Sequence, residues 1–262
     1  MRKLSRLVVV LPLIANLWGC GPEGLEEPRG EDIDDLGELQ LTTNTVTQEL
    51  SYSNGGSWAS PQPATPLSST SDRACFFTRI RGSFDSSGDS VRILASRETW
   101  NLHGAGSTSA AAACATLPGA SAYSTAYEWT AGQPRPTNMG STRGRVCFLT
   151  RVGGAFNSPA DWAGIYESGG SWFLSGASQA RNGYARARCV TVSTYSSEHS
   201  WNQSQGSPSY LGRTSGQVCA LTHMAGQFDG ASEFIELSRA GWHWWLHGGS
   251  ARAGVAAKAR CF

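Results

Sequence analysis

Apolar side chains recur two residues apart along the part of the chain that follows residue 50. The spacing is clearest in three pairs: Val91 with Ile93, Ala163 with Ile165, and Ile235 with Leu237. Because successive strand residues point to opposite faces, each pair lies on one face of an extended segment. Segments 185–189 and 257–261 alternate small and basic residues up to a cysteine, which places one face inward and the other in water. The pattern predicts short antiparallel strands and an all-β fold.

These alternations belong to a sequence repeat with a step of 72 residues. Seven positions recur at that step without a gap, namely Cys75, Thr78, Gly82, Phe84, Trp100, Leu102 and Gly104 with their equivalents in the two following copies. We therefore expect three tandem antiparallel β repeats of about 72 residues, at 50–118, 119–192 and 193–262, each with about four or five strands. The repeats either pack about a pseudo-three-fold axis or follow one another as separate beads.

The N-terminus has the features of an export signal. A basic head is followed by an apolar stretch over residues 7–17 that ends in Leu17-Trp18-Gly19-Cys20, as in a secretory signal peptide. These last four residues resemble the lipobox of bacterial lipoproteins. The resemblance implies that residues 1–19 are removed and that Cys20 is the lipidation site, so that acyl chains hold the protein to a membrane that no helix spans. An ordinary secreted protein is the alternative.

Residues 20–49 carry nine acidic side chains and one basic side chain, which predicts a disordered acidic tether. From residue 50 onward the chain has 17 basic and 11 acidic residues, a net charge of about +6. The basic residues are scattered, so we expect no nucleic-acid partner. In some bacterial lipoproteins an Asp after the lipidated cysteine signals retention in the inner membrane, whereas this chain has Gly21 there. The resemblance therefore implies a lipid-anchored place in the cell envelope at the outer membrane.

Six cysteines besides Cys20 fall two to a repeat: Cys75, Cys114, Cys147, Cys189, Cys219 and Cys261. An exported protein forms disulfides, and three-fold repetition leaves two sensible pairings. Either each repeat closes on itself, as 75–114, 147–189 and 219–261, or neighbouring repeats are joined, as 114–147, 189–219 and 75–261. We favour the first pairing, because a cross-link worth about 2–4 kcal/mol stabilises a unit whose core is marginal at this length.

Acidic or amide residues follow the recurring phenylalanine at two places in each repeat: Asp85, Asn157 and Asp229, then Asp89, Asp161 and Glu233. Carboxylates of this kind could hold a calcium ion. They also cap tight turns by accepting backbone hydrogen bonds. Each loop offers at most two carboxylates, so we favour the turn role and expect no metal.

Tryptophans that recur in every repeat are more simply explained by a shared core than by a binding site. Two such sets exist: Trp58, Trp129 and Trp201, then Trp100, Trp172 and Trp244. Positions that change in one repeat are better candidates for ligand contact. Trp242 stands where the other repeats have Glu98 and Gly170, and Trp245 stands where they have Asn101 and Phe173.

A ligand site is therefore predicted in the third repeat, at Trp242, His243, Trp245 and His247. On a strand, Trp244 and Leu246 point one way, while His243, Trp245 and His247 point the other way. An aromatic ring between polar groups suits the apolar face of a sugar or a protein partner. Packing of Trp245 against a neighbouring repeat and metal binding by the two histidines are the alternatives.

No sequence motif indicates catalysis. The chain contains no Gly-x-Ser-x-Gly elbow and no glycine-rich phosphate loop, so we expect no enzyme, no catalytic residues and no cofactor. The sequence of the repeats resembles segments of secreted bacterial proteins, and this resemblance implies no activity. We expect a surface-anchored, lectin-like module whose partner is a glycan or a cell-surface protein. A structural or protein-binding envelope lipoprotein is the second interpretation, and an enzyme is the third.

Overall fold

The computed structural model describes residues 52–71, 73–117 and 124–262, so the expected signal peptide, lipidation site and tether lie outside the described residues. The described chain consists of strands joined by turns, with one 3-10 turn, η2, at Gln203–Gln205. Within these ranges no helix has the length and apolarity needed to cross a bilayer.

Each repeat contributes six strands, so the expectation of four or five was wrong. The first repeat forms β1 (Tyr52–Ala59), β2 (Thr65–Ser69), β3 (Arg73–Gly82), β4 (Ser90–Ser96), β5 (Thr99–Ala105) and β6 (Thr108–Thr116). The second forms β7 (Tyr127–Thr130), β8 (Thr137–Ser141), β9 (Arg145–Gly153), β10 (Trp162–Ser168), β11 (Ser171–Ala177) and β12 (Tyr184–Thr191). The third forms β13 (His199–Asn202), β14 (Ser209–Arg213), β15 (Cys219–Ala225), β16 (Phe234–Ala240), β17 (His243–Gly249) and β18 (Ala256–Cys261). The extra strands are the first and second strands of each repeat. Apart from β1, these strands have only four or five residues, too few to show a clear alternation.

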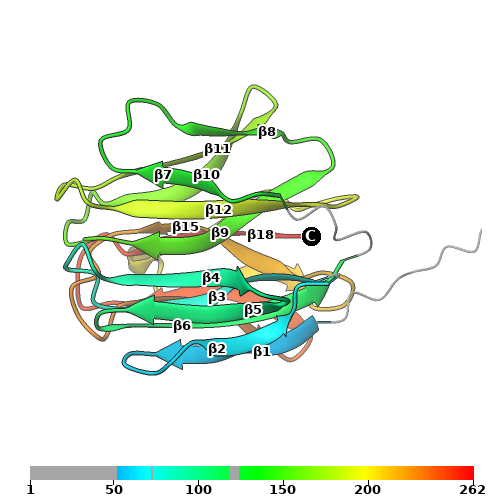
Figure 1. The fold of residues 1–262 in the computed structure, drawn as a ribbon, viewed down its shortest axis with the longest axis horizontal. Helices are drawn as coiled ribbons and strands as arrows, with labels where there is room; N and C mark the ends of the chain where they lie inside the picture. Colours follow the sequence, from blue (N-terminus) through cyan, green and yellow to red (C-terminus); the bar gives the residue numbers. More distant parts are fainter. Residues whose placement is uncertain (1–51, 72, 118–123) are drawn as a thin grey trace, which may run out of the picture. The chain divides into compact units, whose positions relative to one another are not determined.

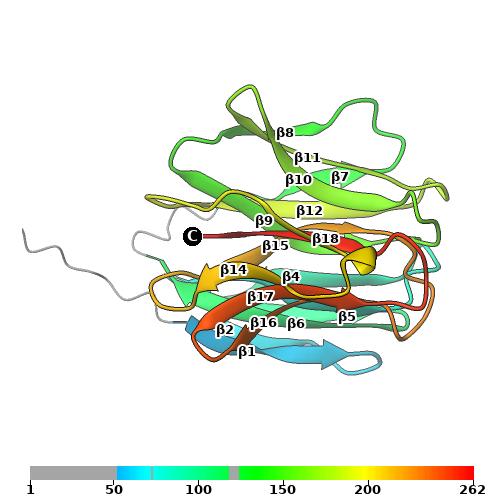
Figure 2. The same ribbon diagram turned by 180° about the vertical axis from the view of Figure 1, so that it is seen from behind.

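The three repeats exchange strands, and every sheet is built from two of them (Figure 1). Sheet 1/3 has the order β1-β6-β3-β16-β17-β14, sheet 1/2 the order β2-β5-β4-β9-β12-β7, and sheet 2/3 the order β13-β18-β15-β10-β11-β8. In each sheet the first, third and sixth strands of one repeat meet the second, fourth and fifth strands of another. Figure 2 shows the third repeat from behind, where β14 lies beside β17 in one sheet and β18 lies beside β15 in another. The arrangement is cyclic, which excludes separate beads.

The recurring phenylalanines close this cycle. The amide of Phe156 donates to the carbonyl of Phe84 at 2.6 Å, that of Phe228 donates to Phe156 at 2.6 Å, and that of Phe84 donates to Phe228 at 2.5 Å. The ring of Phe84 packs edge-on against Phe156 and Phe228, with centroids 6.1 and 6.2 Å away. A closed ring of equivalent hydrogen bonds confirms the pseudo-three-fold packing of the repeats.

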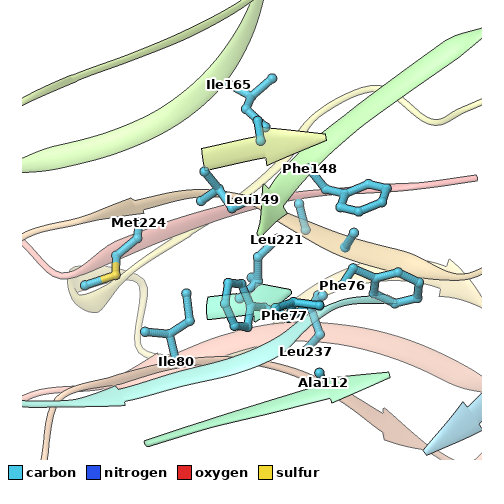
Figure 3. Close-up of a cluster of buried hydrophobic side chains, with 14 of the residues drawn as sticks. Phe76, Phe77, Ile80, Ala112, Phe148, Leu149, Ile165, Leu221, Met224 and Leu237 are labelled. Carbon is cyan, nitrogen blue, oxygen red and sulfur yellow. The ribbon is translucent and has the colours of Figure 1, made fainter. Parts of the chain in front are cut away.

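A second aromatic cluster holds the interior together. Phe76, Phe148 and Phe262 pack with centroids 5.7 to 5.9 Å apart. The first two are equivalent positions on β3 and β9, but the third repeat has Ala220 there. Phe262, next to the end of β18, supplies the missing ring. Figure 3 shows the surrounding core, to which all three repeats contribute buried aliphatic side chains.

The disulfides pair within each repeat, as Cys75–Cys114, Cys147–Cys189 and Cys219–Cys261. Each bond joins directly opposed residues on the third and sixth strands. The favoured pairing is therefore confirmed. All six of these cysteines are buried, so the disulfides form part of the core and do not lie on the surface.

Both recurring sets of tryptophan belong to the core. The Trp100, Trp172 and Trp244 side chains are at most 3% exposed. Each indole N–H donates to a carbonyl 27 residues earlier in the chain, with distances of 3.0, 3.0 and 3.2 Å. Because the polar atom of each ring is satisfied inside the repeat, this set serves packing, as the internal comparison predicts. The set Trp58, Trp129 and Trp201 is also buried.

Candidate functional site

The predicted ligand residues lie on β17, in the outer half of sheet 1/3. Trp244 and Leu246 are buried, whereas His243, Trp245 and His247 are partly exposed on the opposite face. The strand alternation therefore divides the segment as the sequence predicts. The outward side chains lie on an ordered strand whose inward side chains belong to the core, which fixes their spacing.

Tyr210 on the edge strand β14 completes a cluster with two of these residues. It stands directly opposite Trp245, and the two ring centroids are 5.5 Å apart. The His243 ring lies 5.4 Å from Tyr210 and 6.5 Å from Trp245, in edge-to-face arrangements. Tyr210 is 51% exposed. The cluster therefore presents aromatic faces to solvent while its rings hold one another in place.

Trp242 and His247 extend the cluster along the strand in both directions. Trp242 occupies the turn between β16 and β17, where its carbonyl accepts the Thr214 amide at 2.9 Å and its side chain is 79% exposed. His247 packs edge-on against Phe234, with centroids 5.9 Å apart. It also lines a groove of about 290 Å³ beside Trp201. We call Tyr210, Trp242, His243, Trp245 and His247 the aromatic strip.

The aromatic strip suits binding better than chemistry. Trp245 stands opposite the small Ser238 on β16, and His247 stands opposite Glu236. The Glu236 carboxylate and the imidazoles of His243 and His247 lie on the same face of the sheet as the indole ring and offer hydrogen-bonding groups. Flat apolar faces bordered by polar groups match a ligand that has both kinds of surface.

Tyr210 was missed by the sequence analysis, although the comparison that singled out Trp245 could have found it. The equivalent positions in the first two repeats are Pro66 and Asn138, so an aromatic residue at 210 is another departure confined to the third repeat. The signal was overlooked because β14 is only five residues long. A strand that short shows no periodicity of its own.

Two of the six residues that follow the recurring phenylalanine, Asp89 and Asp161, act as turn caps. The Asp89 carboxylate accepts the backbone amides of Asp85 and Ser86 at 3.0 and 2.7 Å. The Asp161 carboxylate accepts the amides of Ser158 and Gln179 at 3.0 and 2.7 Å. These oxygens satisfy backbone donors that would otherwise be orphaned, which favours the turn role over the calcium role.

A second surface feature that the sequence analysis did not anticipate lies on sheet 2/3. Here a groove of about 360 Å³ is lined by Trp162, Tyr166, His223 and Lys258. The His223 ring stacks on Trp162 at 5.5 Å. Burial, helped by the charge of Lys258, lowers the pKa of His223 to about 4, so this imidazole is neutral near pH 7.

Metal and catalytic roles find little support in the described ranges. No group of three or more His, Cys, Asp or Glu side chains gathers there in a way that could hold a metal ion. His243 and His247 both face outward, and each packs against a different aromatic neighbour. Neither a family model nor any curated protein matches this chain.

Proposed function

We propose that this chain is a lipid-anchored binding protein of the cell envelope, without enzyme activity, that holds glycan on the aromatic strip. The observation that carries the proposal is the cluster of Tyr210, Trp245 and His243, whose rings pack against one another. Tyr210 is exposed and the other two rings are partly exposed. The apolar face of a pyranose ring stacks on such side chains, and neighbouring imidazole or carboxylate groups bind its hydroxyls.

The anchoring part of the proposal rests on the lipobox-like residues 17–20. Three buried disulfides support export, because disulfides persist in oxidising compartments outside the cytoplasm. Gly21 after the lipobox cysteine supports placement at the outer membrane. Metabolic labelling with a fatty-acid analogue tests the anchor: label should enter the parent and be absent from Cys20→Ser.

The glycan part is tested by screening the oxidised protein against a panel of neutral polysaccharides and oligosaccharides. Trp245→Ala and Tyr210→Ala should each weaken binding by about tenfold or more, the effect of losing an aromatic anchor. Phe173→Ala is the matched control, because Phe173 occupies the position of Trp245 in the second repeat and lies on sheet 2/3. It should leave the affinity unchanged.

Two results would count against the glycan proposal. One is the absence of binding to every member of the panel while melting and thiol titration show an intact fold. The other is an equal loss of affinity in Trp245→Ala and Phe173→Ala. The first result would favour a protein-binding or structural envelope lipoprotein over a glycan-binding one, because exposed Tyr and Trp are also frequent anchors of protein interfaces.

A further inference from the structure

One row of side chains across the outward face of sheet 1/2 is dominated by arginine. Strand register places Arg92 of β4 opposite Arg151 of β9, and Arg151 opposite Arg186 of β12. His103 of β5 stands at one end of the row, opposite Arg92, and Glu128 of β7 stands at the other end, opposite Arg186. Three guanidinium groups thus occupy consecutive strands that lie about 4.8 Å apart. We call Arg92, Arg151 and Arg186 the arginine row.

The other two sheets carry different residues in the same row. On sheet 1/3 the order across the strands is His247, Glu236, Arg79, Ala111 and Ser57. On sheet 2/3 it is Ser175, Gly164, His223, Lys258 and Ser200. The three sheets share their inward-facing core, so the fold does not require arginine at these outward positions.

The arginine row lowers the stability of the fold. Like charges that stand directly opposite each other on neighbouring strands are destabilising. Glu128 is the one carboxylate in the six strands of this sheet, and it pairs with Arg186 at 2.6 Å. Among the described residues, the recorded ion pairs leave Arg92 and Arg151 without a carboxylate partner.

Neutral neighbours hold these two guanidinium groups in position. Arg151 lies over the ring of Tyr184, 4.4 Å from its centroid. Arg92 donates to Nδ1 of His103 at 3.2 Å. Burial and the charge of Arg92 lower the pKa of His103, which keeps the ring neutral and able to accept. Side chains that are already ordered lose less conformational entropy when a ligand binds.

We infer that the arginine row binds an anionic glycan, a polysaccharide that carries sulfate or carboxylate groups at intervals along its chain. A guanidinium group is planar and pairs with such groups through two parallel hydrogen bonds. Bound anions would supply the negative charge that the row lacks. The inference rests on the proposed function for the sugar carrier, but it uses a different sheet from the aromatic strip.

The test measures binding of the oxidised protein to immobilised heparin and polygalacturonate, with neutral dextran as the uncharged comparison. Binding to heparin but not to polygalacturonate would show that sulfate is required, because heparin carries carboxylates as well as sulfates. Equal binding to both would show that carboxylate is sufficient. Arg151→Gln should lower the affinity for the preferred polymer by about tenfold. Arg143→Gln removes the same charge from an exposed turn outside the row, and it should change the affinity by less than about twofold. Arg151→Lys should fall between Arg151→Gln and the parent, because the charge remains without the planar fork.

Equal losses in Arg151→Gln and Arg143→Gln would overturn the inference, since they would show attraction by net charge alone. The assignment to glycan would be overturned if single-stranded DNA of matched charge bound as tightly as the polymer and if Arg151→Gln lowered both affinities equally. Trp245→Ala separates this inference from the proposed function. If heparin binding falls in Arg151→Gln while no neutral sugar binds, the arginine row stands and the aromatic strip fails. If only neutral sugars bind, and Trp245→Ala abolishes that binding, the arginine row fails.

Discussion

The indole ring of Trp58 lies against Gly104, where a Cβ atom would come within 2.4 Å of the indole Cζ3. The same relationship joins Trp129 with Gly176 and Trp201 with Gly248, each with a closest approach of 2.5 Å. Two of the sequence recurrences therefore have one cause. The tryptophan of the first strand in a repeat is buried only because the fifth strand has no side chain at the facing position.

Replacing such a glycine should destabilise the whole protein. In Gly176→Ala the new methyl group would meet both the Trp129 ring and the backbone carbonyl of Trp162 at 2.5 Å, and the backbone contact cannot be relieved by a rotamer change. We expect a loss of about 1–3 kcal/mol in the free energy of unfolding, measured by urea titration. Gly88→Ala is the control, because its nearest neighbour would be 3.7 Å away. Equal midpoints for the two variants would contradict the packing argument.

In the third repeat Phe262 supplies the ring that Phe76 and Phe148 supply in the other two, and Ala220 stands at their equivalent position. We therefore expect substitutions at positions 220 and 262 to compensate for each other. Phe262→Val removes the third ring of its cluster and should cost about 2–4 kcal/mol of stability, the range for truncating a large core side chain. Ala220→Phe alone overfills the same space and should also destabilise. Together they restore the pattern of the second repeat, which has Phe148 and Val190 at these positions.

The double variant should therefore be more stable than the sum of the two single effects predicts, by more than about 1 kcal/mol. Urea titration of all four proteins in a double-mutant cycle measures this coupling. Strict additivity would show that the two positions do not share one cavity.

Much of the fold was predictable because the core repeats at a constant step. The period-two alternation predicted the all-β class. The recurring Cys, Phe and Trp residues predicted the three units and the buried tryptophans, and favoured the disulfide pairing that the structure has. The exchange of strands between repeats was not predictable, since the contact of β4 with β9 or of β16 with β3 leaves no periodic trace in either strand. Register between distant segments depends on packing that a local pattern does not contain.

The candidate surfaces divide in a similar way. His243, Trp245 and His247 were found because they depart from the repeat within one contiguous strand. The arginine row went unnoticed because its members come from three separate strands of two repeats. Only the register of the sheet brings Arg92, Arg151 and Arg186 together. Scattered basic residues along a sequence can therefore form a concentrated charge on one face.

A repeat taken alone should not fold. Residues 119–192 contain β7 to β12, but β9 pairs with β4 of the first repeat and β10 pairs with β15 of the third. An excised repeat would expose those strand edges and the inward face of every strand, even with Cys147–Cys189 formed. We expect a far-ultraviolet circular dichroism spectrum without strand signal and no cooperative melt, whereas the oxidised whole protein melts in one transition. A cooperative melt of the excised repeat would show that the repeats are independent domains.

His223 should make the stability depend on pH. Its neutral imidazole stacks on Trp162 and stands opposite Lys258, which is itself paired with Glu198 at 2.7 Å. The pKa of about 4 in the folded protein lies below the value of about 6.5 in an unfolded chain. The unfolded state therefore binds a proton first as the pH falls, and each bound proton favours unfolding.

The contribution of His223 is fully present above about pH 6.5 and is lost as the pH falls toward 4, by up to roughly 3 kcal/mol. Urea titrations at pH 7 and pH 4.5 should show a larger loss of stability for the parent than for His223→Gln, which cannot take up a proton. Other groups titrate over this interval in both proteins, so the difference between the two losses is the quantity that isolates His223. His247→Gln, on the aromatic strip, keeps His223 in place and should follow the parent. If His223→Gln loses as much stability as the parent over this interval, the folded state does not hold the His223 ring neutral.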